Sequence, residues 1–233
     1  MAFGVLGGSA VTNTGATTVS GAVGVSPGSS VTGFPPGTTT APPLHLNDAT
    51  AIQAQNDLTT AYNAVASTPC TTTLTGVDPG GLTLNAGVYC FASSAQLTGT
   101  LTLDAQGNPN AVFLFKIGST LTTASASRVL VINGGSTCNV FWQVGSSATF
   151  GTTTAFSGNI LALTSITMTT GANISGRLLA RNGAVTLDTN IIAPCGAGAI
   201  PPGADIPALS GKMLLLLAAL IAVVAMVALR SHA

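Results

Sequence analysis

Few side chains in this sequence could carry out acid–base or metal chemistry. The chain has 233 residues and six aspartates but no glutamate, and its aspartates are scattered: Asp48, Asp57, Asp78, Asp104, Asp188 and Asp205. Cleavage of polysaccharides, an activity of many β-helix enzymes, needs paired carboxylates or a metal with a base. His45 lies in a proline-rich loop, and Arg177 and Arg181 could pair with Asp188, so we expect structural roles for them. The sequence predicts no enzyme, no cofactor and no metal site.

The four cysteines are better suited to disulfide chemistry. An even number fits an exported protein, and none lies in the Cys-x-x-Cys or Cys/His pattern of a structural zinc site. Three pairings are possible, and free buried thiols are the alternative. We expect Cys70–Cys90 and Cys138–Cys195, because these pairs are local or close the end of the domain.

Charge is scarce in this chain and threonine is abundant. Charged residues make up 5% of the sequence and the formal net charge is zero, whereas an average domain has about 25% charged residues. Such a surface lacks the Lys/Arg clusters that bind nucleic acid. The 34 threonines favour strands and the 28 glycines favour turns. A hydrophobic content of 46% excludes a disordered chain.

Short apolar strands recur along most of the chain with a period near 18 residues. Ser157-Gly158-Asn159 is followed 18 residues later by Ser175-Gly176-Arg177, and Thr149, Thr167 and Thr186 are spaced by 18 and 19. About three short strands in each period predict the coils of a β-helix, in which every coil is hydrogen-bonded to its neighbours. A β-sandwich is the alternative, but sandwiches do not usually repeat their sequence in register.

One helix is predicted from about Asp48 to Ser67. Asn47 or Asp48 can cap its first N–H groups, and Pro69 ends it. The spacing of its apolar residues predicts a stripe that packs along another apolar surface. We expect this stripe to contain Ile52, Leu58, Ala61, Tyr62 and Val65.

The C-terminal segment predicts a membrane anchor. Residues 213–229 are 17 consecutive apolar residues between Lys212 and Arg230, and as a helix they would span roughly 25 Å, enough for a bilayer core. We therefore divide the chain into a β-helix domain (1–197), a Pro/Gly linker (198–210) and a transmembrane anchor (211–233). The N-terminus has no signal-peptide pattern, so we expect the true start of an exported protein to lie upstream.

Motifs along residues 3–195, in order, resemble the microbial ice-binding family of the DUF3494 type. The motifs are Phe3-Gly4-Val5-Leu6-Gly7-Gly8, Thr32-Gly33-Phe34-Pro35-Pro36-Gly37, Asn110-Ala111-Val112-Phe113-Leu114-Phe115, Asn139-Val140-Phe141-Trp142 and Gly176-Arg177-Leu178-Leu179-Ala180. The resemblance implies a mainly β fold. This is a right-handed, discontinuous parallel β-helix with one α-helix packed alongside, to which the tail adds a transmembrane helix. It also implies adsorption to ice through one flat sheet face.

Two further resemblances concern individual residues. Members of this family often carry Thr-Ala/Gly-x-Thr/Asn on the ice face, and four segments here match that motif fully or in part. The resemblance therefore implies ice-binding side chains at Thr14, Thr17, Thr123, Ser125, Thr152, Thr154, Thr170 and Asn173. In the tail, Ile206-Pro207-Ala208-Leu209 resembles a bacterial sorting signal of the Ile-Pro-Thr-Leu type, with Ala208 in place of threonine.

We expect an exported monomer at the bacterial cell surface, anchored in the membrane through residues 213–229 or released by cleavage of the tail. Its partner would be the surface of an ice crystal, and nucleic acid is excluded. An adhesin that binds glycans is the alternative, although an anchored ice-binding domain would itself attach a cell to ice. Exposed aromatic side chains are typical of sugar sites, and aromatic residues are only 5% of the chain.

Overall fold

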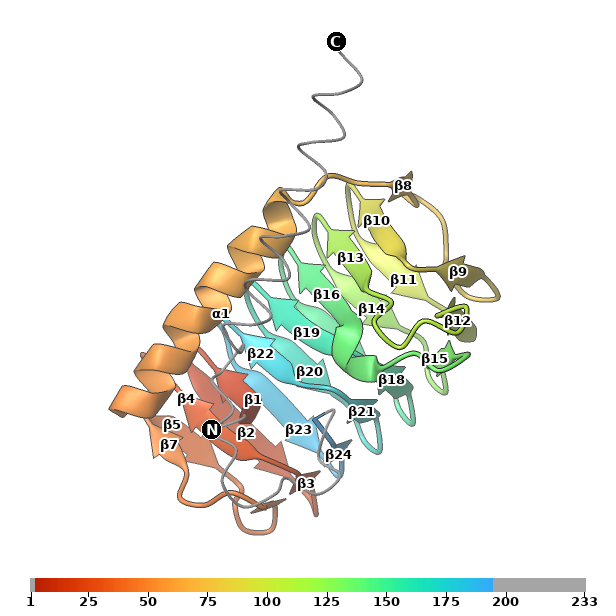
Figure 1. Cartoon of the computed structure of the whole chain (residues 1–233). Helices are drawn as coiled ribbons and strands as arrows, with labels where there is room; N and C mark the ends of the chain where they lie inside the picture. Colours follow the sequence, from red (N-terminus) through yellow and green to blue (C-terminus); the bar gives the residue numbers. More distant parts are fainter. Residues whose placement is uncertain (1–2, 195–233) are drawn as a thin grey trace.

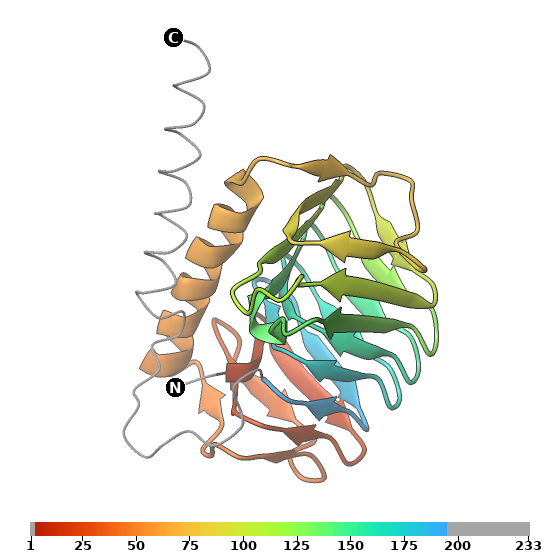
Figure 2. The same ribbon diagram turned by 45° about the vertical axis from the view of Figure 1, so that its right-hand side comes forward.

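The computed structural model describes residues 3–194, which form three parallel sheets around one interior (Figures 1 and 2). In spatial order, sheet A contains β7 (His45–Leu46), β4 (Ala22–Val25), β1 (Phe3–Gly7), β22 (Leu178–Ala180), β19 (Asn159–Ala162), β16 (Val140–Val144), β13 (Phe113–Ile117), β10 (Gly87–Phe91) and β8 (Thr72–Thr73). Sheet B contains β11 (Ala95–Leu97), β14 (Leu121–Thr123), β17 (Ala148–Phe150), β20 (Ile166–Met168), β23 (Val185–Asp188), β2 (Ala10–Thr14) and β5 (Ser30–Thr32). Sheet C contains β6 (Thr38–Thr39), β3 (Thr18–Val19), β24 (Ile191–Ile192), β21 (Asn173–Ser175), β18 (Ala155–Ser157), β15 (Arg128–Ile132), β12 (Thr100–Asp104) and β9 (Thr83–Asn85).

The chain visits the sheets in the order A, B, C, and each such set of three strands is one coil. The first two coils, β1–β3 and β4–β6, form one end of the stack. After α1 the chain resumes at the other end and coils back, until β22, β23 and β24 pair with β1, β2 and β3. We call this junction between the last coil and the first coil the seam. The predicted parallel coils are confirmed, and Ser157 pairs with Ser175 as the 18-residue repeat requires.

The interior is filled by side chains that point inward from all three sheets. At the end of the stack built by β10–β18, five aromatic rings form a continuous group. Phe115 stacks on Trp142 with ring centroids 3.8 Å apart, Tyr89 lies 5.4 Å beyond Phe115, and Phe156 lies 4.8 Å from both Trp142 and Phe150. This core removes the inward side chains of the strands from water.

Helix α1 (Ala49–Ser67) lies along the outside of sheet A (Figure 2). Its buried side chains include Leu58, Tyr62 and Val65, as the spacing predicts. The prediction for Ile52 is wrong, since 45% of its side chain is exposed. Ile52 stands six residues before Leu58, which places the two side chains 120° apart around a helix of 3.6 residues per turn. Ala51, seven residues before Leu58, lies on the buried face instead.

The helix is fixed at both its start and its middle. Asp48 is the N-cap and accepts from the backbone N–H of Ala51 at 2.9 Å, and its other oxygen lies 2.7 Å from Nδ1 of His45. These two contacts hold the pKa of Asp48 below its ordinary value. In the middle, the buried Gln55 amide donates to the carbonyls of Gly7 and Ala180, which lie on either side of the seam. The helix therefore also holds the last coil to the first.

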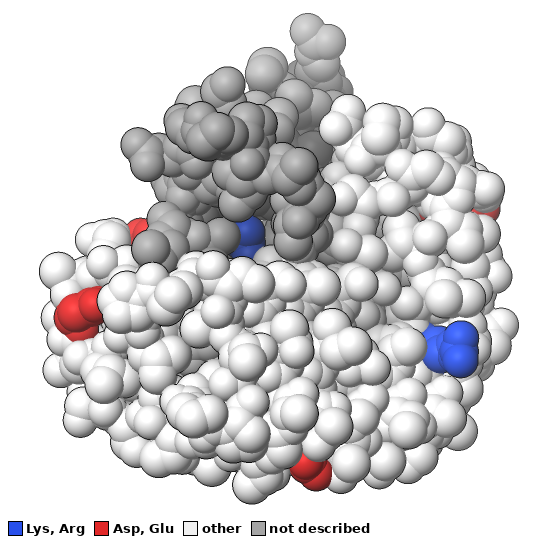
Figure 3. Space-filling model, turned by 90° about the horizontal axis from the view of Figure 1, so that it is seen from below, with Lys and Arg blue, Asp and Glu red and all other residues white. Residues whose placement is uncertain are grey.

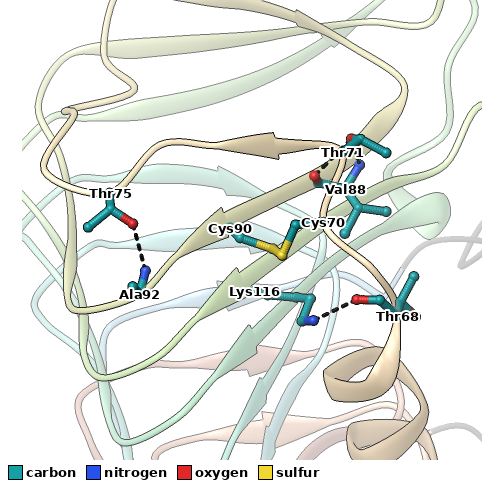
Figure 4. Close-up of a disulfide and its surroundings, with 8 residues drawn as sticks. All are labelled: Thr68, Cys70, Thr71, Thr75, Val88, Cys90, Ala92 and Lys116. Carbon is teal, nitrogen blue, oxygen red and sulfur yellow. Dashed lines mark hydrogen bonds between the residues drawn. A yellow bond between two sulfur atoms is a disulfide. The ribbon is translucent and has the colours of Figure 1, made fainter.

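Among the described cysteines, the predicted pair Cys70–Cys90 is confirmed (Figure 4). The bond ties the segment after α1 to β10, and Lys116 donates to the carbonyl of Thr68 beside it at 2.6 Å. Cys138 is also disulfide-bonded, and its predicted partner, Cys195, lies outside the described residues. The predicted linker (198–210), sorting motif and anchor (211–233) lie there too. Between residues 3 and 194, the structure contains no helix both long and apolar enough to span a bilayer.

Candidate functional site

The outer face of sheet B carries one unbroken line of threonines. Six threonines from six neighbouring strands stand in register, all exposed or half-exposed, and a glutamine, Gln96, continues the line at one end. We call these six residues the threonine column; in spatial order from Gln96 they are Thr122, Thr149, Thr167, Thr186, Thr12 and Thr32. Neighbouring strands of a sheet lie about 4.7–4.9 Å apart, so the hydroxyls and methyls of the column repeat at that interval.

The threonines point outward because their neighbours in each strand fill the core. In β20, Ile166 and Met168 are buried on either side of Thr167, and in β23 Val185 and Leu187 are buried on either side of Thr186. Side chains alternate between the two faces of a strand. Burying the apolar residues therefore places every column threonine on the outside, with its χ1 angle restricted by β-branching.

Beside the column, the face stays flat. Two positions before Gln96 and before each threonine of the column stands a small residue, and the set is Ser94, Thr120, Ser147, Ser165, Ala184, Ala10 and Ser30. The Thr120 hydroxyl donates to that of Ser94 at 2.9 Å, so neighbouring coils are also linked here. Asp188, at the end of β23, is the one charged residue in the strands of sheet B. No long or charged side chain therefore rises from the middle of the face.

The scarcity of charge extends beyond sheet B. Viewed from below relative to Figure 1, the surface shows only a few separated charged side chains (Figure 3). Within residues 3–194, no group of three or more His, Cys, Asp or Glu side chains could hold a metal ion. The threonine column of sheet B is thus the regularly repeating feature of the surface of residues 3–194.

Comparison with known proteins decides the family. The profile of the Ice-binding-like family matches residues 5–193. This chain belongs to the ice-binding family. It is 61% identical over 192 residues to an ice-binding protein of Nostoc sp. (strain HG1), covering 82% of this chain and 71% of the relative. It is 35% identical to an ice-binding protein of Colwellia sp. over 204 residues, covering 82% of this chain and 79% of the relative.

Solved structures of ice-binding proteins have the same fold. One from an Antarctic biological consortium aligns with a TM-score of 0.80 at 50% identity, covering 83% of this chain and 87% of the other. Another, from the Antarctic ascomycete Antarctomyces psychrotrophicus, aligns with a TM-score of 0.79 at 44% identity, covering 82% and 93%. The ice-binding family therefore accounts for the domain from its first strand to its last.

The eight residues that the family motif singled out lie at or next to the corner between sheets B and C. Five of them are exposed or half-exposed: Thr14, Ser125, Thr152, Thr170 and Asn173. The other three are a correction to the prediction, because their side chains are buried with at most 3% exposed: Thr17, Thr123 and Thr154. A buried hydroxyl cannot contact an ice lattice outside the protein.

These three threonines instead hold the corner together. The hydroxyls of Thr123 and Thr154 are 2.9 Å apart, and Thr154 also donates to the carbonyl of Ala124. The hydroxyl of Thr17 accepts from the backbone N–H of Asn190 at 3.1 Å. Buried polar groups need such partners. The motif therefore marks a turn that has polar side chains both inside and outside. Its spacing alone does not show which of them are buried and which are exposed.

The family motif identifies none of the column threonines, although the sequence contains part of the pattern that does. The spacing of Thr149, Thr167 and Thr186 by 18 and 19 residues marks one threonine in each of three successive coils. Thr12 could not be added from spacing, because it meets Thr186 only across the seam. The register of chain-distant strands is the information that the sequence lacks.

The predicted pairing of Arg177 and Arg181 with Asp188 is wrong. Asp188 accepts hydrogen bonds from threonine hydroxyls, and Arg181 lies over the ring of Tyr62, 4.8 Å from its centroid. Burial lowers the pKa of Arg177. His45 has the structural role expected for it, at the start of α1, where its ring also meets that of Phe3 edge-on at 5.3 Å.

Proposed function

We propose that this protein adsorbs to ice, as a single chain, through the threonine column of sheet B. The observation that carries the proposal is the unbroken register of six outward threonines on a flat face, none of them charged. Membership of the ice-binding family supports the activity, and the geometry of sheet B supports this surface rather than another.

Physical chemistry explains why such a face suits ice. Ice is a neutral lattice of water, and a charged side chain would keep its own hydration shell and disturb that lattice. A threonine methyl favours ordered water nearby, while the hydroxyl can donate and accept a hydrogen bond. Because the strands hold these groups at a constant spacing and χ1 is stiff, little ordering entropy is lost on adsorption. Weak contacts then add up over the whole column.

The exposed residues of the family motif extend this surface at its margin. Thr14 lies two positions after Thr12, and Thr152 and Thr170 lie in the turns that leave sheet B. We assign them, with Ser125 and Asn173, to the edge of the adsorbing surface. Their contribution is expected to be smaller than that of the column, because the turns do not repeat with the regularity of the strands.

The activity is tested with the purified chain by ice recrystallisation inhibition and by the shape of ice crystals grown in its presence. We expect inhibition and faceted crystals at micromolar concentration. An unfolded sample of the same chain serves as the control for colligative effects. Ordinary recrystallisation and round crystals with the folded protein would refute the proposal.

We further propose that the domain is exported and tethered at a bacterial surface by residues 213–229. The support is the apolar run between Lys212 and Arg230, preceded by the Ile206-Pro207-Ala208-Leu209 motif. An anchored domain would attach a cell to ice. Cell fractionation tests this: the full chain should be found with membranes and a chain ending at Ser210 should not. Equal amounts of both in the soluble fraction would contradict the tether.

A further inference from the structure

Asp188 is the one charged side chain in the strands of sheet B, and it lies at the seam. It ends β23 two residues after the column residue Thr186, and its neighbour across the seam is Thr14 of the first coil. A charge beside an ice-adsorbing face would be expected to disturb ordered water, so its place there needs an explanation.

The carboxylate of Asp188 accepts from threonine hydroxyls of two neighbouring coils. One oxygen accepts from the hydroxyl of Thr170, which follows β20 in the preceding coil, and the other accepts from Thr189 in its own coil at 3.0 Å. The hydroxyl of Thr14, across the seam, donates instead to the carbonyl of Leu187 at 3.4 Å. The bonds to the carboxylate, that from Thr170 foremost, lower the pKa of Asp188, so the group is ionised at neutral pH.

The backbone beneath the carboxylate is also held in place. The N–H of Asp188 donates to the side chain of Asn190 at 2.6 Å. Asn190 is buried, and its amide in turn donates to the carbonyls of Thr169 and Ala172 at 2.9 and 2.7 Å. The acceptor that the two hydroxyls share therefore has a fixed position on the corner of the solenoid.

An ionised carboxylate only accepts hydrogen bonds, whereas a hydroxyl can turn its proton in several directions. A threonine bonded to Asp188 must point its proton at the carboxylate and keep its lone pairs for water. We propose that Asp188 is a positioning residue, which orients the hydroxyls of Thr170 and Thr189 and so extends the ice-adsorbing surface along its margin at the seam. This inference rests on the proposed function of sheet B. It also explains why one charge is compatible with this face.

The test is the Asp188→Asn variant of the full chain, with Asp104→Asn as the matched control. Asp104 ends β12 in sheet C and likewise accepts from a neighbouring side chain, that of Asn133 at 2.7 Å. An asparagine at 188 presents N–H groups to one hydroxyl and reverses the direction of its proton. We expect the concentration for half-maximal recrystallisation inhibition to rise about two- to tenfold, the equivalent of one ordered side chain. Asp104→Asn should leave it unchanged.

A readout that a merely structural role would not move is the side-chain order of the threonines. Three-bond couplings measured by NMR should show that the χ1 angles of Thr170 and Thr189 become averaged in Asp188→Asn, while that of Thr149 stays fixed. Unchanged couplings would overturn the inference, and so would averaged couplings with wild-type inhibition. If the wild-type chain did not inhibit recrystallisation at all, the proposed function would fail instead, and the couplings would still report on the positioning.

A second variant keeps the inference testable if Asp188→Asn does not fold. Thr170→Val removes one of the two hydroxyls and leaves the carboxylate with that of Thr189. It should weaken inhibition to a similar extent, and combined with Asp188→Asn it should add little, because residues acting through one contact are not additive. Independent, additive losses would contradict the shared role.

Discussion

Sheets B and C are built by the same coils and contain similarly short strands, yet their outer faces differ. Sheet B presents the threonine column. The corresponding line on sheet C, read strand by strand, is Thr38, Thr18, Ile191, Asn173, Ala155 and Arg128. This line mixes apolar, polar and charged side chains of different lengths. Threonine content alone therefore does not distinguish the two faces; one residue type kept in register does.

Sheet A shows the third use of a solenoid face. Helix α1 packs on β1, β7, β13 and β16, all of them in this sheet. Outward residues of sheet A are consequently apolar or paired, as in Leu161, which is buried, and Gln143, whose amide donates to the hydroxyl of Tyr62 at 2.7 Å. One face is thus covered, one is irregular and one is regular, and the regular face is the one to which we assign adsorption to ice.

The largest effect is expected from a bulky residue in the middle of the column. Thr167→Tyr should abolish recrystallisation inhibition, because a ring standing above a flat face keeps the other threonines from the lattice. The matched variant Thr18→Tyr, on the exposed face of sheet C, should retain wild-type inhibition. Equal losses from the two variants would show that sheets B and C do not differ in function.

A smaller effect should follow when one column residue keeps its shape but loses its hydroxyl. Thr186→Val preserves the branched side chain and removes one hydrogen-bonding group, which contributes about 0.5–1.5 kcal/mol. We therefore expect a roughly two- to twelvefold rise in the concentration for half-maximal inhibition. Thr18→Val on sheet C is the control, and a rise of the same size there would undermine the assignment of the column.

The column can also be lengthened. Gln96 occupies the next position after Thr122 and has a longer, more flexible side chain. Gln96→Thr should improve inhibition by up to about twofold, because a seventh ordered threonine joins the face at low entropic cost. Activity titrations of the purified variant measure this, and a clear loss of inhibition would mean that Gln96 itself contributes a contact.

The smallest effect on ice activity is expected from the corner threonines that are buried. Thr154→Val should leave inhibition unchanged per folded molecule, while lowering the free energy of unfolding by about 1–3 kcal/mol, because the buried Thr123 hydroxyl loses one of its two partners and the Ala124 carbonyl loses a donor. Denaturant titration measures the loss. Thr152→Val, at an exposed position of the same turn, should lower stability much less. A larger loss of stability in Thr152→Val than in Thr154→Val would contradict the buried position of Thr154.

Much of this architecture could be predicted from the sequence, because periodicity reports on packing. The 18-residue repeat gave the coils, the helical stripe gave α1, and local spacing gave the Cys70–Cys90 bond. The site was harder, because a shift of one residue moves a side chain to the opposite face of a strand. Thr122 and Thr123 are neighbours, yet one belongs to the column and the other is buried. Only the strand register separates them.

The seam was the other feature that the sequence could not provide. Thr12 and Thr186 are adjacent in sheet B but far apart in the chain. Their pairing depends on α1 returning the chain to the opposite end of the stack, so that the last coil meets the first. Local sequence patterns do not show which distant strands pair. Both the continuity of the column and the position of Asp188 at the seam depend on that pairing.

The most direct test of the column is adsorption of the fluorescently labelled protein to a single ice crystal. Thr149→Tyr on sheet B and Ala155→Tyr on sheet C alter exposed positions of the same coil. We predict that wild-type protein and Ala155→Tyr label the crystal on the same planes, and that Thr149→Tyr leaves it dark. Labelling by Thr149→Tyr together with loss of labelling by Ala155→Tyr would contradict the assignment of sheet B.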